Sequence, residues 1–359
     1  MKKASLNIAL IVILASIVIL SACESRFPLS SLPDPLSGVT VEDTTYLEIT
    51  PAFEGIGTPG ALLIGNDQLM YVADTENNRI IMMNIAGNIL GTRPITQPTS
   101  ISQDMRLDLL VGGSVVTASK DTVGALFRIK LAQAKHQIET AIMDTIWRET
   151  ARPKRRFVGV AALPDNEFLA VRQGPDNSSF VDPDGRVLLF NAKSVFVTPL
   201  GDLVTRAGSG ITDINQPSGI AAFPNSRDFI LIQHSVGVAY GAIWMIYQRS
   251  SDFEGWLPKF DPSKPEQKDV EFIRPNRFVQ ASAVVVDGRR RDIFVADAAL
   301  DTIIKFDSRG RFKSESFGFA RTGGRMLKPT GLAFFDRTLY VADAGTKRIL
   351  RFRLSTEFQ

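Results

Sequence analysis

The sequence predicts an all-β protein in which six small antiparallel sheets pack around one axis. A pattern of short apolar strands recurs six times between residues 45 and 359. The turns inside each unit are too short for the crossover connection that a parallel strand pair requires. A single sheet of three or four strands cannot bury both of its faces alone. Six of them arranged around an axis cover one another, and this arrangement is a six-bladed β-propeller.

The repeat is clearest in a strand with the sequence aromatic-Val-Ala-Asp. It occurs at 71–74, 294–297 and 340–343, and each copy is followed within a few residues by a second apolar strand. A further apolar strand, often led by proline, precedes each copy and has a counterpart in the less regular units. We expect these six inner strands to begin at Pro59, Pro98, Phe157, Pro217, Gln280 and Pro329.

The run Pro-x-Gly-apolar-Ala, then aromatic-Val-Ala-Asp, then Arg-Ile-apolar-apolar resembles the NHL repeat. Units one, five and six match it well, whereas units two to four keep the strand order but lack the Val-Ala-Asp sequence. The resemblance covers about residues 45–357 and implies a six-bladed propeller. It implies little about activity, because one fold carries many functions.

The last unit contains only three strands and ends near residue 354. An additional strand, Thr45–Ile49, precedes the first unit and belongs to none of the six. We expect this strand to form the outer edge of the sixth blade and so to close the ring, because an open sheet edge invites aggregation.

The N-terminal segment has the composition of an export signal. Residues 1–3 are basic, residues 4–20 are apolar apart from three polar positions, and small residues precede Cys23, the only cysteine. The apolar run is short for a membrane span. The sequence Leu20-Ser-Ala-Cys23 resembles the lipobox of bacterial lipoproteins, which implies cleavage before Cys23 and its acylation. An ordinary signal peptide, or an uncleaved anchor with a chance cysteine, is the alternative.

The chain therefore divides into a signal peptide at 1–22, a lipid-anchored tether rich in proline and serine at 23–44, and the propeller at 45–359. Removing Lys2 and Lys3 from the 41 basic residues leaves 39 against 38 acidic ones. This balance and an extracytoplasmic location argue against nucleic-acid binding. Within the lipoprotein resemblance, Glu24 in place of an aspartate favours the outer membrane of a Gram-negative cell envelope.

The acidic residue that ends each regular second strand is predicted to be structural. A carboxylate at the start of a turn accepts hydrogen bonds from turn amides or pairs with a following arginine. Copies of one repeat position lie far apart around a ring and do not converge on one catalytic centre. The residues assigned to this structural group are Asp74, Arg79, Asp297, Asp343 and Arg348.

Blades two to four diverge most from the repeat, and a binding surface is expected on their loops. The turns at 112–124, 172–185 and 234–241 are long, and so are the connections between blades at 144–156, 202–216 and 249–276. Both kinds of loop open on one face of a propeller, and inserted loops are common binding sites. The candidate binding residues are Arg172, Asp176, Asn177, His234, Tyr240 and Trp256. Neutral drift in tolerated loops is the alternative.

Two further loop patterns have competing interpretations. The basic cluster is either a solvated turn or a patch for an acidic partner or lipid headgroup; its residues are Arg152, Lys154, Arg155 and Arg156. Asp176, Asp182 and Asp184 offer oxygens to calcium, but their spacing departs from the EF-hand loop and Asp182-Pro-Asp-Gly185 is also a plain turn signal. We expect no metal site and no cofactor other than the lipid on Cys23. Residues 289–291 are interpreted as a hairpin tip on the opposite face.

An enzymatic role is the alternative function. Some six-bladed propellers are lactonases or lyases that hold a metal on the axis. His136 and His234 are too few for a histidine-rich zinc site, whereas a lactonase-type site of Glu, Asn and Asp is compatible with the composition. No nucleophile elbow, phosphate loop or dinucleotide motif is present. The favoured interpretation is a lipid-anchored, extracytoplasmic propeller that binds a protein partner or acts as a scaffold in the cell envelope.

Overall fold

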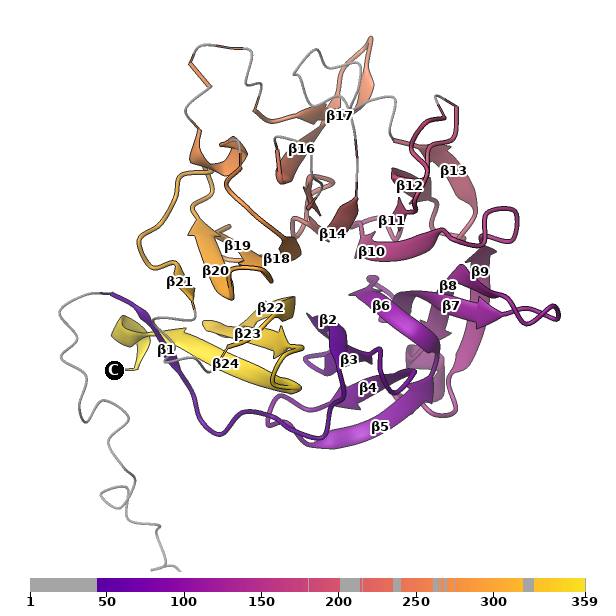
Figure 1. The fold of residues 1–359 in the computed structure, drawn as a ribbon, viewed down its shortest axis with the longest axis horizontal. Coiled ribbons are helices and arrows are strands. Elements are labelled where there is room, and N and C mark those ends of the chain that lie inside the picture. The colour runs from indigo at the N-terminus through magenta and orange to yellow at the C-terminus, as the bar shows by residue number, and fades with distance from the viewer. Residues whose placement is uncertain are drawn as a thin grey trace, which may run out of the picture. The chain divides into compact units, whose positions relative to one another are not determined.

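The computed structural model describes residues 44–358 apart from gaps at 180, 201–213, 215, 235–239, 261–263, 265, 268–269, 275 and 319–325. Within these residues the chain forms 24 strands, which assemble into six four-stranded antiparallel sheets. Figure 1 shows the six sheets arranged around one central axis. The predicted all-β, six-bladed propeller is therefore confirmed. No helix in the described part of the chain is long and apolar enough to cross a membrane.

In the first five blades the four strands follow one another along the chain, with the first strand nearest the axis (Figure 1). Blade 1 comprises β2 (Pro59–Ile64), β3 (Met70–Asp74), β4 (Arg79–Met83) and β5 (Ile89–Pro94). Blade 2 comprises β6 (Thr96–Gln103), β7 (Leu109–Val116), β8 (Thr122–Lys130) and β9 (Ile142–Arg148), with the short 3-10 helix η2 (Ala132–Ala134) before β9. Blade 3 comprises β10 (Arg156–Ala162), β11 (Phe168–Gln173), β12 (Arg186–Phe190) and β13 (Phe196–Pro199).

The second half of the ring repeats this order. Blade 4 comprises β14 (Pro217–Ala222), β15 (Phe229–Gln233), β16 (Ala242–Arg249) and β17 (Glu254–Pro258), and the 3-10 helix η3 (Glu271–Ile273) follows it. Blade 5 comprises β18 (Ala281–Val286), β19 (Ile293–Asp297), β20 (Thr302–Phe306) and β21 (Phe317–Gly318). Blade 6 comprises β22 (Pro329–Phe335), β23 (Thr338–Asp343) and β24 (Arg348–Leu354), and the 3-10 helix η4 (Ser355–Glu357) follows β24.

The sixth blade takes its outer strand from the other end of the propeller. Strand β1 (Tyr46–Glu48) pairs antiparallel with β24, so that Tyr46 lies opposite Leu354. Tyr46 is buried, and its ring centroid lies 5.9 Å from that of Phe294 and 5.1 Å from that of Phe317. The prediction that an N-terminal strand closes the ring is confirmed.

The apolar core lies between neighbouring blades. Tyr71 and Ala73 of β3, for example, pack in one cluster with Leu109 and Val111 of β7. The second strand of every blade is covered on both faces by this packing, and β3, β15, β19 and β23 are buried along their whole length. This explains why the second strands have continuous apolar sequences where a half-exposed strand would alternate.

A belt of hydroxyl groups joins the inner strands around the axis. In four of the six inner strands, the residue after the leading position donates a hydrogen bond to a backbone carbonyl of the next blade: Ser218 to Ala281 at 2.5 Å, Ser282 to Pro329 at 2.6 Å, Thr330 to Pro59 at 2.6 Å, and Thr99 to Phe157. Blade 1 has Gly60 at this position, and Thr75 makes the equivalent bond to the Pro98 carbonyl at 2.6 Å. These five residues form the hydroxyl belt. Val158 of blade 3 occupies the sixth position and has no hydroxyl.

The propeller has two faces, which carry different loops. The connection face carries the links between blades and the turns between second and third strands. The first-turn face carries the turns between first and second strands and between third and fourth strands. Antiparallel order within every sheet imposes this division, because each inner strand runs from the connection face to the first-turn face.

Two of the expected loops differ from the prediction because they contain strand. The sequence predicts one long connection at residues 249–276, yet β17 lies inside this range and forms the outer strand of blade 4. In blade 2, β7 and β8 continue their pairing as far as Val116 and Thr122, so the long loop there is an extended hairpin. The turn-rich sequence around β17, with Gly255 and Pro258 in a five-residue strand, concealed it.

Candidate functional site

The structure brings most of the predicted loop residues of blade 3 together on the connection face. They belong to two segments, the link at 149–156 and the insert at 174–185, which lie against each other; we call them the blade 3 platform, with residue 180 outside the described chain. Arg155, from the link, and Arg172, at the end of β11, lie beneath it. Both guanidinium groups are buried.

Arg155 fastens the insert to the link. Its Nε lies 2.6 Å from Asp184 Oδ1, and its Nη1 lies 2.8 Å from Asp182 Oδ2 and 3.5 Å from Glu149 Oε2. Its Nη2 also donates a hydrogen bond to the Asp182 carbonyl at 2.9 Å. Burial opposes the charge of Arg155, but the hydrogen bonds from its guanidinium to Asp184 and Asp182 outweigh that effect and raise its pKa.

Arg172 reinforces the same contacts from the sheet side. Its Nη2 lies 2.5 Å from Asp182 Oδ1, its Nη1 lies 3.3 Å from Glu149 Oε1, and its Nε donates to the Asp184 carbonyl at 3.1 Å. Burial would raise the pKa of Asp182, but the two arginines more than compensate and lower it. Arg172, a candidate binding residue, is therefore buried, because its guanidinium holds the loop.

The polar residues of the insert stabilise its own turn. Asp176 accepts hydrogen bonds from the backbone N–H and hydroxyl of Ser178 at 3.0 and 2.6 Å, and these bonds lower its pKa. Asn177 accepts a bond from the Gly185 N–H at 2.6 Å. The carboxylates that suggested calcium are thus engaged with arginines and backbone amides. Within the described residues no cluster of three His, Cys, Asp or Glu side chains could hold a metal ion.

The exposed side chains of the platform include two basic residues and one large apolar residue. Arg152 and Lys154 of the predicted basic cluster are exposed, whereas Arg155 is buried and Arg156 donates to the Thr122 and Arg155 carbonyls at 3.2 and 2.8 Å. Val181, at the tip of the insert, is 84% exposed. Arg152 Nη1 lies 3.7 Å from Asp176 Oδ2, so Lys154 is the one residue of the basic cluster that is exposed and forms no ion pair within the described residues.

The other binding candidates lie in blade 4. Trp256 is buried against Phe229 and donates its Nε1 hydrogen to the Arg227 carbonyl at 2.6 Å, so it is a core residue of β17 and does not reach solvent. Tyr240 is partly buried between two core clusters. His234 is partly buried, with Nδ1 3.3 Å from the Ala281 carbonyl oxygen. None of these three residues belongs to the two segments of the blade 3 platform.

The repeated acids occupy equivalent positions on the connection face. Asp74 is buried, accepts the Gly57 N–H at 3.1 Å and pairs with Arg79 at 2.9 Å. Asp297 accepts the Val279 and Gln280 N–H groups at 2.6 and 3.1 Å, which ties the preceding link to the blade.

Asp343 does the same with the Leu327 N–H at 2.8 Å and also accepts the Thr346 hydroxyl at 2.7 Å. Burial raises the pKa of Asp343. No ion pair joins it to Arg348 within the described chain. Cys23 lies outside the described residues.

The axis is narrow, and it widens on the first-turn face. The six inner strands surround a central volume of about 70 Å³. At the first-turn face it opens into a funnel of about 550 Å³, lined by the ends of the inner strands and by Asn66, Gln68, Gln103 and Asn225. The polar side chains around this mouth are mainly amides.

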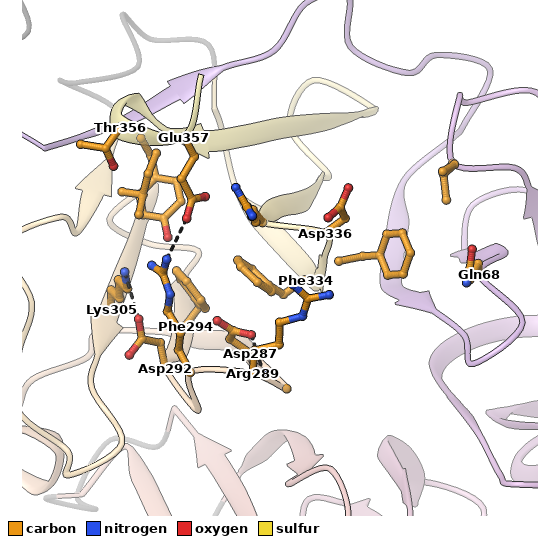
Figure 2. Close-up of a pocket in the computed structure, with 17 residues that line it drawn as sticks. Gln68, Asp287, Arg289, Asp292, Phe294, Lys305, Phe334, Asp336, Thr356 and Glu357 are labelled. Atoms are coloured by element: carbon orange, nitrogen blue, oxygen red, sulfur yellow. Dashed lines mark hydrogen bonds and ion pairs between the residues drawn. The ribbon is translucent and has the colours of Figure 1, made fainter. Parts of the chain in front are cut away.

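A larger hollow of about 920 Å³ adjoins the funnel between blades 5, 6 and 1, and shares Gln68 and Phe334 with it. Figure 2 shows its aromatic floor, where Phe294 and Phe334 stack at a centroid distance of 5.3 Å. Lys305 is buried beside them, with Nζ 3.1 Å from Asp292 Oδ2 and 3.8 Å from Glu315 Oε1.

Sequence reasoning missed this hollow. Burial, together with Asp292 and Glu357, raises the pKa of Tyr46, which lines the same space. The one local signal was Lys305, a charged residue inside the apolar strand β20.

No protein-family model matches the chain, and no curated protein sequence matches it. Solved structures match in fold. A luciferin-regenerating enzyme has a TM-score of 0.56 and 13% identity over 87% of this chain and 95% of its own. A putative gluconolactonase has a TM-score of 0.56 and 11% identity, covering 88% and 93%. An auxiliary nutrient binding protein from Bacteroides thetaiotaomicron has a TM-score of 0.54 and 9% identity, covering 84% and 70%. Identities this low show the shared fold alone.

Proposed function

We propose that this chain is a lipid-anchored, extracytoplasmic NHL-like propeller that binds a protein partner in the cell envelope through the blade 3 platform. The single observation that supports the proposal most is the buried network of Arg155 and Arg172 beneath a loop that adds nothing to the sheet. Acylation of Cys23 would hold the propeller at one membrane and present this loop to partners there.

Burying the charged groups that hold the platform costs free energy. A role in recognition would account for this cost. A turn between second and third strands needs few residues, as the step from Asp74 to Arg79 shows. The blade 3 insert is longer, and two arginines and two of their acidic partners, Glu149 and Asp184, are buried in order to hold it. Buried ion pairs seldom add net stability, but they do fix geometry. A loop fixed before binding loses less conformational entropy when a partner docks.

The exposed groups indicate what kind of partner fits. Val181 is an apolar side chain presented at the tip of a fixed loop, and Lys154 and Arg152 are the exposed basic side chains of the adjoining link. Asp182 is half-exposed although both buried arginines contact it. A protein surface with a small apolar recess and acidic residues at its rim would complement this arrangement.

The test is a cross-linking capture of the full lipoprotein from its native membranes. The double substitution Val181→Asp with Lys154→Glu changes the platform surface and leaves the buried network intact, and we expect it to abolish capture of the partner. The matched control is Met105→Asp with Lys193→Glu, which makes the same chemical changes at exposed residues of blades 2 and 3 on the first-turn face. Capture that survives the platform variant would contradict the proposal.

The anchor is tested separately in the same preparation. The mass of the N-terminal peptide should show an acylated Cys23, and Cys23→Ser should lose that modification together with membrane retention of the mature protein. A mature N-terminus at another residue would refute the lipoprotein assignment and leave the capture experiment valid.

Metal-dependent hydrolysis of a small molecule, as the name gluconolactonase implies for one protein of similar fold, is the second candidate. The hollow beside the axis favours it, because it is large enough for a small ligand and Asp287 is buried at its wall. A lactone screen with and without added divalent cation tests it. Turnover that is lost in Asp287→Asn, at an unchanged unfolding temperature, would support this function over the first.

A further inference from the structure

The first-turn face of blades 5 and 6 carries a group of exposed basic side chains. Four turns or chain ends meet there: residues 287–292, 307–313, 336–337 and 355–357. Their exposed cations are Arg289, Arg290, Arg291, Arg309, Arg311 and Arg337. We call this set the arginine patch.

The acids that accompany the patch lie beneath it. Arg311 is 69% exposed while its partner Asp307 is 17% exposed, and Arg290 is 59% exposed while its partner Glu357 is 10% exposed. Asp287 is buried, and Asp292 faces Lys305 inside the hollow, as Figure 2 shows. Asp336 is the one exposed acid among these turns. The four segments carry seven basic and five acidic residues. Because most of the acids are covered, the surface that a large partner meets is cationic.

Within the described residues, three arginines of the patch form no ion pair. No described acidic side chain pairs with Arg289, Arg309 or Arg337. Arg291 lies 3.8 Å from Asp228, a long contact, and is nearly half-exposed. Exposed guanidinium groups without a partner suit phosphate oxygens, which accept their paired hydrogen-bond donors.

The segment that links Cys23 to the propeller is attached at this same face. Strand β1 begins opposite the end of β24, where Thr45 and Ser355 exchange hydrogen bonds of 2.8 Å (Ser355 N–H to the Thr45 carbonyl) and 3.3 Å (Thr45 N–H to the Ser355 hydroxyl). Two residues beyond Ser355, Glu357 pairs with Arg290 of the patch at 3.0 Å. Thr45, through which the segment from Cys23 joins the propeller, and the arginine patch therefore lie on the same face.

We infer that the arginine patch docks on the anionic phospholipid headgroups of the bilayer in which Cys23 is anchored, and so turns the connection face away from the membrane. This rests on the acylation of Cys23 in the proposed function. A tether alone holds the propeller near the bilayer in any orientation, whereas a cationic patch beside the attachment point selects one. Basic side chains close to an anionic surface are attracted over about a Debye length, roughly 10 Å at moderate salt.

The experiment uses the full lipoprotein reconstituted in vesicles. Because Cys23 is the only cysteine and is acylated, an added thiol is unique. A fluorophore is attached at Ser308→Cys, in the patch, or at Ser119→Cys, an exposed position on the connection face. Lipids with a headgroup-linked quencher report contact. We expect quenching at 308 but not at 119 in vesicles that contain phosphatidylglycerol, and loss of the difference in pure phosphatidylcholine or at high salt.

Charge reversal supplies the control. Arg289→Glu with Arg337→Glu should abolish quenching at 308. Two charge reversals on the connection face, Arg152→Glu with Lys154→Glu, should leave the quenching at 308 unchanged. Equal quenching at both sites, or quenching that survives reversal of the patch, overturns the inference while the mass of the Cys23 peptide still reports the anchor. An acidic protein as the true partner of the patch would leave the probe at 308 unquenched on these protein-free vesicles, which also refutes bilayer docking.

Discussion

Lys259 lies half-buried after β17, with Nζ 3.3 Å from the centroid of the Trp244 ring and a hydrogen bond of 3.1 Å to the Ser308 carbonyl. Burial, with a smaller contribution from the charge of Arg291, lowers the pKa of Lys259 from 10.5 to about 8. Between pH 8 and 10.5 the unfolded chain keeps a proton that the folded chain has lost. Stability therefore rises with pH over this window, and the cost of the buried charge is fully present below it.

Competitive labelling with an amine-reactive reagent should show this shift. We predict that the reactivity of Lys259, followed by mass spectrometry, rises with a midpoint near pH 8, well below the value of about 10.4 for an unperturbed lysine. Arg291→Ala should move the midpoint upward, because it removes the neighbouring positive charge. A midpoint that does not respond to this substitution would show that burial alone sets the pKa.

At the scale of single elements, the hydroxyl belt lacks a hydroxyl at the interface between blades 3 and 4. A single substitution can supply it. Val158→Thr preserves the shape of the side chain and adds a hydroxyl where every other interface already has one. By analogy with Thr99 and Thr330, it should donate to the Pro217 carbonyl and raise the free energy of unfolding by about 0.5–1.5 kcal/mol. Thr330→Val should lower it by a similar amount. Urea unfolding of the two variants beside the wild type measures both effects.

Strand β1 is a second element whose removal has a clear expected result. A chain that starts at Pro51 lacks β1, which exposes the edge of β24 and uncovers Phe294 and Phe317. We predict that it aggregates, since an unpaired edge strand templates association. A chain that starts at Thr44 keeps β1 and should unfold as one cooperative unit. Light scattering during thermal unfolding distinguishes the two, and equal behaviour would mean that β1 does not close the ring in solution.

At the scale of the whole molecule, the interface between blades 6 and 1 brings two inner-strand backbones close together on the axis. A Cβ on Gly331 would lie 2.7 Å from the Leu62 backbone nitrogen, whereas a Cβ on Gly219 would meet only the flexible end of Ile232 at 3.3 Å.

Gly331→Ala should therefore lower the free energy of unfolding by about 1–3 kcal/mol through overpacking. Gly219→Ala should be near neutral or gain up to about 1 kcal/mol from the stiffer unfolded chain. Chemical unfolding curves of both variants test this, and similar losses at the two positions would contradict a tighter closure between blades 6 and 1.

The overall architecture could be predicted from the sequence because it depends on local patterns. The repeated Val-Ala-Asp strands and the unpaired strand at Tyr46 are visible within a few residues, and the structure confirms both the six blades and the closure. Strand β17 was missed because its glycine and proline give a turn signal that tertiary pairing with β16 overrides.

The candidate sites depend on long-range contacts, which a single sequence does not display. Arg155 meets Asp184 across 29 residues, so an arginine that looked solvated is buried. The hollow combines Gln68, Lys305 and Glu357, which come from three blades. Only the charge of Lys305 within an apolar strand hinted at it, and one such residue does not locate its partners.

The pairing of β1 with β24 also determines when the ring can close. Synthesis delivers β1 before any blade and delivers β24 only after five blades have been made. Until then the first strand has no partner, and the stack of sheets stays an open arc with two exposed edges. A ribosome that stops early releases a chain with no closed form to adopt, which remains a substrate for proteases. Closure of the ring therefore waits for the third strand of blade 6, because only β24 offers β1 its partner.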